Sequence, residues 1–469
     1  MNRRLAVVLV ALLVVAQTYA ALAGTETGHY VGGADEGIRV GLVRSFRGTK
    51  QITVLASSNY TVARGGSGEK LAACTNLEPI TLDPAAGKLS LKLVNGSGVD
   101  AGASVTITAD DASAMLSVDS PRKPGKQYRG ALEVTLKSGC LQLVNIARIE
   151  DYLPGVLAGE MPSSYPDEAL KAQAIAARSY TIRARGKHAA SGYDLCDDSH
   201  CQVYDGAMRE KPSSTRAVLA TAGQVMTFGG RIASIMYCAD CGGATECYAE
   251  AHNGAIPYMP CVVEPDGIAH SAWEKTYKIA ELTAKLASAG IKGCDGLQKI
   301  AVAKTSTSGR ARTFELTGSK GSVTMDGIKL RAALGRDGIR STLCTVETSA
   351  DGVVTFRGKG WGHGIGMCQV GAGALAGPPF SYTCAQILAH YYPGTVVTGS
   401  ADGIEATSGE ALAKPSTPRQ PVTQGEGERP STTKRPTPPQ PSPTGEGAPS
   451  RKPSEAARSI DVRVDAPRL

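Results

Sequence analysis

Aromatic side chains are scarce in this chain: they make up 5% of its 469 residues, with two tryptophans and five phenylalanines. A hydrophobic core must therefore be built mostly from aliphatic residues and alanine, and the apolar share of 42% is large enough for one. No basic run is interleaved with aromatics, which argues against nucleic acid as a partner. The modest net charge of +7 suits an anionic envelope or wall polymer.

Long apolar runs are missing after the N-terminus, so no later segment is predicted to span a membrane. Residues 1–23 have the layout of a signal peptide: a charged start, an apolar segment, and Ala21-Leu22-Ala23 before the expected cleavage site. The mature protein is therefore expected outside the cytoplasm, in the periplasm, in the cell wall or secreted. An uncleaved anchor is the alternative for the same segment.

Apolar residues also run out at the C-terminus. Residues 401–469 are dominated by Pro, Ser, Thr, Gly and charged side chains, which predicts a disordered tail that cannot bury a core. Between signal and tail, residues 24–400 are expected to form one main unit of the α+β class. Its N-terminal part alternates in the manner of strands, with a hairpin predicted around Lys137-Ser138-Gly139, and a mixed core follows around two helices.

The stretch of residues 149–185 predicts those two helices, joined at a proline-marked elbow. Glu160 continues the apolar face of the first helix, and Pro162 predicts that this helix ends close to Glu160. The negative end of the helix dipole and partial desolvation both favour a protonated carboxyl, as a general acid requires. The alternative is a helix-terminal acid paired with a nearby arginine. The apolar residues of this face are Leu153, Val156 and Leu157.

Basic residues recur every seven positions on the second helix, at Lys171, Arg178 and Arg185. They are predicted to line one side of it. One interpretation is a solvated helix face, and the other is a basic wall beside Glu160.

Twelve cysteines suit an oxidising compartment. Cys196, His200 and Cys201 lie within six residues and could bind one tetrahedral zinc, whereas a local Cys196–Cys201 disulfide is the competing interpretation. Farther along, the segment CADCGGATECY carries three more cysteines, for which structural disulfides are the favoured prediction.

The run GKGWGHGIGMCQVGAGALA is a glycine-rich loop whose backbone could approach a ligand closely. Trp361 could stack on a sugar ring, and His363 could donate or accept a proton. Taken alone, such a loop is more typical of a structural turn with an exposed histidine.

Together, EDYLPGVLAGEMPSSYPDEALKAQAIAARSYTIRAR and the downstream GKGWGHGIGMCQVGAGALA resemble the sporulation stage II protein D family, which shares a domain with the amidase-enhancer LytB proteins. The segments DLCDDSHCQVYDG, CADCGGATE, IPYMP and ILAHYYPGT also look like family signatures in the expected order. The resemblance covers residues 37–398 and leaves out the tail. It implies that residues 24–400 form the catalytic domain.

The resemblance implies a peptidoglycan lytic transglycosylase, which cleaves the bond between N-acetylmuramic acid and N-acetylglucosamine and leaves a 1,6-anhydro end. Glu160, in the EMP motif, would be the single acid and base. A structural zinc at Cys196, His200 and Cys201 is favoured, with His188 or water as fourth ligand. The expected partners are glycan strands and a cell-wall amidase. The expected substrate-binding residues are Trp361, His363, Gln369, Tyr258, Lys171 and Arg178.

Two positions depart from the family pattern. Cys368 replaces a serine found in many relatives and is expected to pair with Cys384 instead. Pro260 stands where relatives often place a lysine, two residues after Tyr258. The alternative function is a non-catalytic wall-binding protein that enhances an amidase. A zinc-dependent amidase is disfavoured, because two thiolates and a histidine within six residues resemble a closed structural site.

Overall fold

The structure, a computed structural model, describes residues 37–121, 123–252, 254–292, 294–335 and 338–399. The predicted signal peptide and C-terminal tail lie outside these residues. The described part is a strand-rich mixture of helices and strands, which confirms the predicted α+β class. None of its helices combines the length and apolar character needed to cross a membrane.

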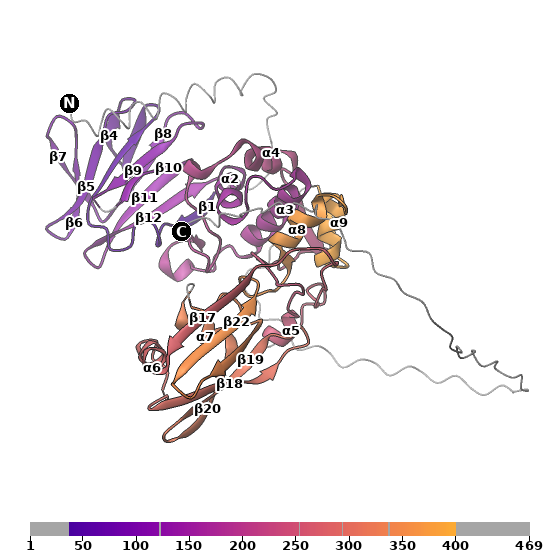
Figure 1. Ribbon diagram of the computed structural model, residues 1–469. Helices are drawn as coiled ribbons and strands as arrows, with labels where there is room; N and C mark the ends of the chain where they lie inside the picture. Colours follow the sequence, from indigo (N-terminus) through magenta and orange to yellow (C-terminus); the bar gives the residue numbers. More distant parts are fainter. Residues whose placement is uncertain (1–36, 122, 253, 293, 336–337, 400–469) are drawn as a thin grey trace, which may run out of the picture. The chain divides into compact units, whose positions relative to one another are not determined.

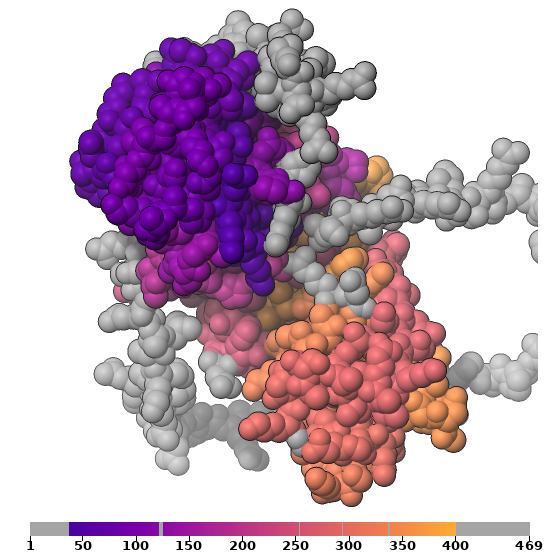
Figure 2. Space-filling model, turned by 90° about the vertical axis from the view of Figure 1, so that its left-hand side faces the viewer, coloured from indigo at the N-terminus to yellow at the C-terminus, as the bar shows by residue number. Residues whose placement is uncertain are grey.

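Two sheets make up the N-terminal part, and their strand pairs are antiparallel except for the parallel pair of β1 and β13 (Figure 1). In both, buried and less buried side chains alternate, so each sheet has one face against a shared core. Figure 2 shows these strands, in indigo and violet, as a closely packed surface. The first sheet runs β13 (Leu195–Cys196), β1 (Ile38–Gly41), β12 (Cys140–Ala147), β11 (Ala131–Lys137), β8 (Ser104–Ala109), β3 (Tyr60–Arg64) and β4 (Lys70–Cys74). The second runs β10 (Lys123–Tyr128), β9 (Leu116–Ser120), β2 (Ile52–Ala56), β5 (Ile80–Ala85), β6 (Lys88–Lys92) and β7 (Gly98–Gly102).

The hairpin of β11 and β12 delivers the chain to the helices. Its two-residue turn, Ser138-Gly139, has φ values of 50° and 75°, as a type I′ turn requires. The hairpin predicted at this position is thus confirmed. β12 then leads, through Arg148, directly into α2 (Ile149–Glu160).

Five helices share the core of the two sheets. One of them, α3 (Asp167–Arg183), is central, and the other four pack on it. Alanines dominate the buried surface of α3, so its neighbours can approach it closely. The other four helices are α2, α4 (Pro212–Ala220), α8 (Gln369–Ala376) and α9 (Cys384–Tyr391). Small strands complete this region: β14 (Val225–Phe228), β15 (Arg231–Ile232) and β24 (Val396–Thr398) in one sheet, and β16 (Tyr237–Cys238) with β23 (Met367–Cys368) in another. Three short helical segments are Ala189–Ser191, Ala207–Arg209 and α5 (Tyr248–Ala251).

Residues 272–359 form a module with a hydrophobic core of its own, built around Phe314 and Phe356. One of its sheets consists of β17 (Ala272–Lys278), β22 (Val353–Lys359) and β21 (Cys344–Thr348). The other consists of β18 (Leu297–Thr305), β19 (Ala311–Gly318) and β20 (Gly321–Asp326). Two helices, α6 (Ile279–Ser288) and α7 (Gly327–Leu334), contribute buried leucines to the same core.

Candidate active site

Glu160 is the last residue of α2, as Pro162 predicted. The next residue, Met161, is extended at φ −131° and ψ 139°, which stops the helix. Leu157, on the same face, is fully buried, while Glu160 itself is half-buried. The carboxylate is held by the backbone N–H of Val203, which donates to Oε1 at 2.6 Å.

Three tyrosines from three elements surround the carboxylate of Glu160: Tyr152 on α2, Tyr180 on α3 and Tyr237 on β16. Burial raises the pKa of each phenol, and the negative charge of Glu160 raises it further. These hydroxyls therefore stay neutral at physiological pH. Tyr180 and Tyr237 keep part of their surface exposed.

Gln202 fixes the segment that holds Glu160. Its side chain is fully buried and makes four hydrogen bonds. Oε1 accepts from the hydroxyls of Tyr152 at 3.2 Å and Thr181 at 2.8 Å. Nε2 donates to the carbonyl of Ala177 at 3.3 Å and to the hydroxyl of Tyr237 at 3.0 Å. The residue before the Val203 donor is thus tied to α2, α3 and β16 at once.

A cluster of two thiols and two imidazoles lies immediately before Gln202. One ligand atom each from His188, Cys196, His200 and Cys201 lies within 4.8 Å of all the others. Three separations are 3.3 Å from His188 Nε2 to Cys201 Sγ, 3.6 Å from His200 Nδ1 to Cys201 Sγ, and 3.8 Å from His200 Nδ1 to Cys196 Sγ. A tetrahedral zinc with ordinary bond lengths has ligand separations of about 3.3–3.8 Å. The four side chains therefore fit this ion.

The thiols of this cluster differ in acidity. Their mutual hydrogen bond raises the pKa of Cys196 and lowers that of Cys201. Both cysteines are free of disulfides, which goes against the competing Cys196–Cys201 bridge. The predicted metal ligands are thus brought together, and His188 lies in the place of a fourth.

The glycine-rich loop lies beside β16, since β23 pairs with it in parallel and Met367 is opposite Tyr237. The glycine-rich loop therefore lies next to Tyr237, whose pKa is raised by burial and by the charge of Glu160. Gln369, at the start of α8, is 3% exposed and donates to Gln173 of α3 at 3.4 Å. Its predicted contact with substrate is not supported by this burial.

Trp361 and His363 are already engaged by the protein. The guanidinium of Arg340 lies 4.8 Å from the centre of the Trp361 ring, so a sugar could stack only on the opposite face. His363 Nδ1 accepts the N–H of Ile365 at 3.0 Å. Burial, together with nearby arginine charges, lowers the pKa of His363 to about 4. This histidine is neutral at physiological pH, and the predicted proton transfer by it is not supported.

The predicted contact of Arg178 with substrate is not supported by its surroundings. Its side chain is 1% exposed and forms two 2.7 Å hydrogen bonds with the carboxylate of Glu150. It also donates to the carbonyls of Gln224 at 3.1 Å and Val218 at 3.3 Å. Arg178 thus joins the start of α2 to the end of α4. The face of α3 that carries it is covered by α4, which the seven-residue spacing of the basic residues could not indicate.

Lys171 and Tyr258 also have partners of their own. Lys171 donates to Glu168 at 2.6 Å, and this pairing raises the pKa of Lys171 and lowers that of Glu168. Tyr258 is 7% exposed, and its hydroxyl accepts the N–H of Ser234 at 2.8 Å. Its ring packs 4.8 Å from that of Phe228. Two of the three basic residues of the α3 repeat, Lys171 and Arg178, are thus paired with acids of α2 and α3.

The remaining cysteine predictions have a mixed outcome. Cys247 and Cys261 form a disulfide. Cys238 and Cys241 are free, and so are Cys368 and Cys384, so the expected Cys368–Cys384 pairing is wrong. Cys368 lies against Cys238 and Cys241 instead.

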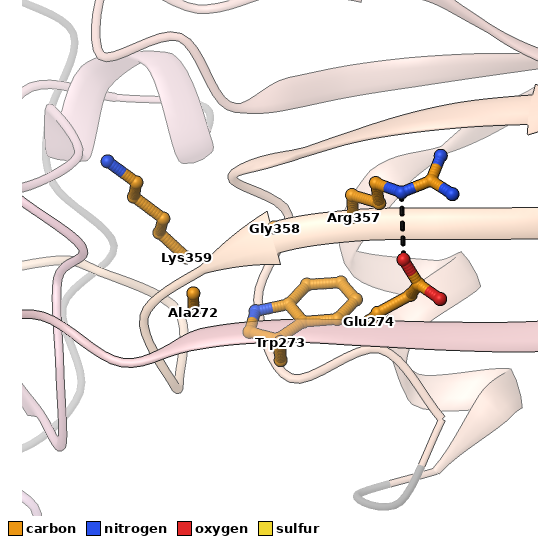
Figure 3. A pocket seen from close by; sticks show the side chains of 6 residues that line it. All are labelled: Ala272, Trp273, Glu274, Arg357, Gly358 and Lys359. Carbon is orange, nitrogen blue, oxygen red and sulfur yellow. Dashed lines mark hydrogen bonds and ion pairs between the residues drawn. The ribbon is translucent and has the colours of Figure 1, made fainter.

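A separate pocket of about 560 Å³ opens in the module of residues 272–359 (Figure 3). The indole of Trp273 lies beside Gly358 on the neighbouring strand, and Arg357 pairs with Glu274 at 2.8 Å. Lys359 extends away from this pair. The pocket shares no lining residue with the surroundings of Glu160.

Sequence reasoning missed the residues that support Glu160 directly. Gln202 and Val203 follow Cys201 in the run CQVYDG, but nothing in the spacing indicates that this run returns to α2. Tyr237 gave no signal either. Only the predicted metal cluster pointed to this segment.

Comparison with known proteins identifies the region that carries this site. The family described as stage II sporulation protein matches residues 137–228, and a domain of unknown function matches residues 265–366. The chain is 30% identical to stage II sporulation protein D of Bacillus subtilis over 275 residues, covering 55% of this chain and 76% of that protein. Identity to the Bacillus amyloliquefaciens protein of the same name is 31%, covering 53% and 74%. A Bacillus subtilis amidase enhancer is 30% identical over 293 residues, but the chain spans only 40% of its length. The chain belongs to the stage II sporulation protein D family.

Proposed function

We propose that this protein is a peptidoglycan lytic transglycosylase that works outside the cytoplasm, with Glu160 as its single acid and base. The observation that carries the proposal is the carboxylate at the end of α2, half-buried among tyrosines and held by the Val203 N–H. A carboxyl group fixed in this way is positioned to exchange a proton with a bound sugar.

One carboxyl group is enough for this reaction. Hydrolysis of a glycosidic bond usually requires a pair of carboxylates, one on each side of the bond. In a lytic transglycosylase the 6-hydroxyl of the muramic acid residue is the nucleophile. Glu160 first gives its proton to the leaving oxygen and then, as a carboxylate, accepts the proton of that hydroxyl.

The other acids of the two helices have cationic partners and lie at the helix starts. Glu150 pairs with Arg178, and Asp151 with Arg148. On α3, Asp167 pairs with Arg216, and Glu168 with Lys171. They stabilise the first turns of α2 and α3, as their positions in the sequence indicated.

We propose a structural role for zinc at His188, Cys196, His200 and Cys201. Zinc bound there would cross-link the segment before Gln202 and so hold the Val203 N–H against Glu160. With four protein ligands the ion has no open position for a catalytic water, which disfavours a zinc-dependent amidase.

The test is incubation of purified protein with peptide-free glycan strands, followed by mass spectrometry of the product ends. Wild type should yield anhydro-muramyl ends, and Glu160→Gln should yield none. Glu168→Gln is the matched control, since Glu168 is also a half-buried glutamate of this helix pair, and it should cleave like wild type. Continued cleavage by Glu160→Gln would refute the assignment.

A second candidate is a non-catalytic protein that binds peptidoglycan and enhances a cell-wall amidase, as the name of the amidase enhancer suggests. Adding the chain to a purified amidase and measuring release of stem peptides distinguishes the two. Enhancement that survives Glu160→Gln, without any anhydro product from wild type, would favour the second candidate.

A further inference from the structure

Two cysteine thiols and one histidine, of Cys241, Cys368 and His270, lie within 4.8 Å of one another at a second place in the described structure, and the thiol of Cys238 adjoins Cys368. Cys238 of β16 lies opposite Cys368 of β23, and the Cys368 thiol is within hydrogen-bonding reach of the thiols of both Cys238 and Cys241. The backbone N–H of Cys241 also donates to Cys368 Sγ at 3.2 Å. All three cysteines are buried and none is in a disulfide.

A ring nitrogen of His270 lies within 4.8 Å of the sulfurs of Cys241 and Cys368. The side chain is 9% exposed. Its Nδ1 is 2.7 Å from the carboxylate of Asp240, whereas Nε2 is buried without a hydrogen-bond partner in the described part of the chain. Since a buried nitrogen of this kind is costly, it indicates a ligand that the side chain is built to hold.

Asp240 orients this imidazole. Its carboxylate accepts the backbone N–H groups of Gly242 at 2.9 Å and Ser271 at 2.8 Å, besides Nδ1 of His270. A carboxylate that accepts from Nδ1 fixes the tautomer in which Nε2 carries a lone pair. This carboxylate–histidine arrangement is the one that supports histidine ligands in metal sites.

We propose that Cys241, Cys368 and His270 bind a zinc ion, with Cys238 as the fourth ligand. Thiolate sulfur and imidazole nitrogen are the donors that zinc prefers, and Cys238 and Cys241 have the two-residue spacing of zinc-binding loops. The site is separate from the cluster around His200, and it does not depend on the proposed activity.

The surroundings can balance the charge of this site. Oε1 of Glu264 is 3.3 Å from Cys241 Sγ and accepts the hydroxyl of Tyr391 at 2.7 Å, while Oε2 has no partner among the described residues. Glu264 is therefore placed to take the proton that the Cys241 thiol loses on coordination. The buried guanidinium of Arg310 donates to the carbonyl of Cys241 and adds positive charge.

Zinc at this site would connect three segments that are far apart in the sequence. These are the turn after β16, the loop that ends at His270, and the start of α8. The ion would hold the glycine-rich loop against β16 and thus beside Tyr237. Its role is structural, because all four positions are filled by the protein.

The first measurement counts metal. Full-length protein is loaded with zinc under reducing conditions and weighed by native mass spectrometry. Cys241→Ser/Cys368→Ser should carry one zinc fewer than wild type. Cys140→Ser, which removes a free thiol outside the cluster, should carry as many as wild type. Equal zinc in wild type and the double variant would overturn the proposal, as would a wild-type mass lower by two hydrogens with Cys241 and Cys368 joined in a disulfide.

The second measurement needs no cysteine variant at this site. In a Cys196→Ser/Cys201→Ser chain, added Co²⁺ should produce an intense thiolate-to-metal absorption band, and Asp240→Asn in that background should weaken Co²⁺ binding by roughly 10–100-fold. Absence of the band would overturn the proposal. If that background does not fold, zinc X-ray absorption of wild type decides: an average of about two and a half sulfurs per zinc supports both sites, and two or fewer contradicts the second.

Discussion

The hydrogen bonds of Gln202 allow a stability prediction with an internal control. Replacing Gln202 by leucine keeps the side chain close to the same size but removes all four of its hydrogen bonds. Thr181 retains a second acceptor, the carbonyl of Ala177 at 2.8 Å. The hydroxyls of Tyr152 and Tyr237 lose the partner that the structure gives them.

The magnitude follows from those two hydroxyls. A buried polar group left without a partner costs about 1–3 kcal/mol, so Gln202→Leu should lower the free energy of unfolding by about 2–6 kcal/mol. The substitution also loosens the Val203 N–H that holds Glu160. Cleavage of glycan should therefore fall even under conditions in which the variant remains folded.

Gln173→Leu is the matched control. Gln173 is also fully buried, on α3, but its described hydrogen bonding is a single 3.4 Å contact with Gln369, and its Nε2 has no partner among the described residues. Removing its amide relieves one unsatisfied donor, Nε2 of Gln173, and takes away the weak 3.4 Å acceptor of the Gln369 amide, so the two effects offset each other. This variant should therefore lie within about 1 kcal/mol of wild type.

The assay is urea unfolding of both variants and wild type, followed by far-ultraviolet circular dichroism and tyrosine fluorescence. The expected result is a midpoint that drops markedly for Gln202→Leu and hardly moves for Gln173→Leu. If the two variants lost the same stability, side-chain size rather than hydrogen bonding would explain the result. The account of Gln202 would then be refuted.

Three further predictions concern other parts of the fold. Arg178→Met should lower the free energy of unfolding in urea by about 3–5 kcal/mol, because it leaves the carboxylate of Glu150 without its partner. Adding Glu150→Gln should restore part of this loss. An unchanged free energy of unfolding in Arg178→Met would contradict the ion pair. Gly366 has φ +71°, and a Cβ there would lie 1.9 Å from a carbonyl oxygen, so Gly366→Ala should lower the free energy of unfolding by about 3–5 kcal/mol. Gly229 has φ +58° and open space around it, so Gly229→Ala should lower it by only about 1–2 kcal/mol. Equal losses in the two variants would contradict the clash at Gly366. The folded-state pKa of His363, about 4, lies below its ordinary 6.5, so the unfolded chain binds more protons between these values. The unfolding free energy should therefore fall as pH drops from 6.5 towards 4, and His363→Gln should lose this component; an identical pH profile would refute it.

Local signals in the sequence predicted the local structure well. Pro162 placed the end of α2 at Glu160, and Ser138-Gly139 placed the hairpin turn, because each depends on backbone preferences within a few residues. The close spacing of Cys196, His200 and Cys201 likewise kept these side chains within reach of one another.

The environment of Arg178 could not be predicted in the same way. A seven-residue repeat identifies a face of α3 but does not say whether water or another helix covers that face. Alanines make α3 apolar around most of its circumference, so α4 and α8 can pack on it. The basic residues alone are also consistent with a solvated helix face. The seven-residue repeat of basic residues therefore identifies a helix face but does not identify a binding surface.

The expected Cys368–Cys384 disulfide was wrong, because the contacts of Cys368 are with cysteines distant in the sequence. Cys241 and Cys368 are brought together by the parallel pairing of β16 and β23, two strands of two residues each. Strands this short leave no periodic pattern to detect. Nothing in the sequence around Cys241 therefore indicates that Cys368 and His270 lie within 4.8 Å of it.

The module of residues 272–359 explains how such distant segments can still form one site. β17 and β22 are antiparallel, with Ala272 opposite Lys359, and the N–H of Gly360 donates to the carbonyl of Ser271 at 2.8 Å. The chain therefore leaves and re-enters the main core at neighbouring points. Since the module closes on its own core, its length does not change the distance between His270 and the glycine-rich loop. The short pairing of β16 with β23 forms across this closed base, and it places Met367 opposite Tyr237 and Cys368 opposite Cys238.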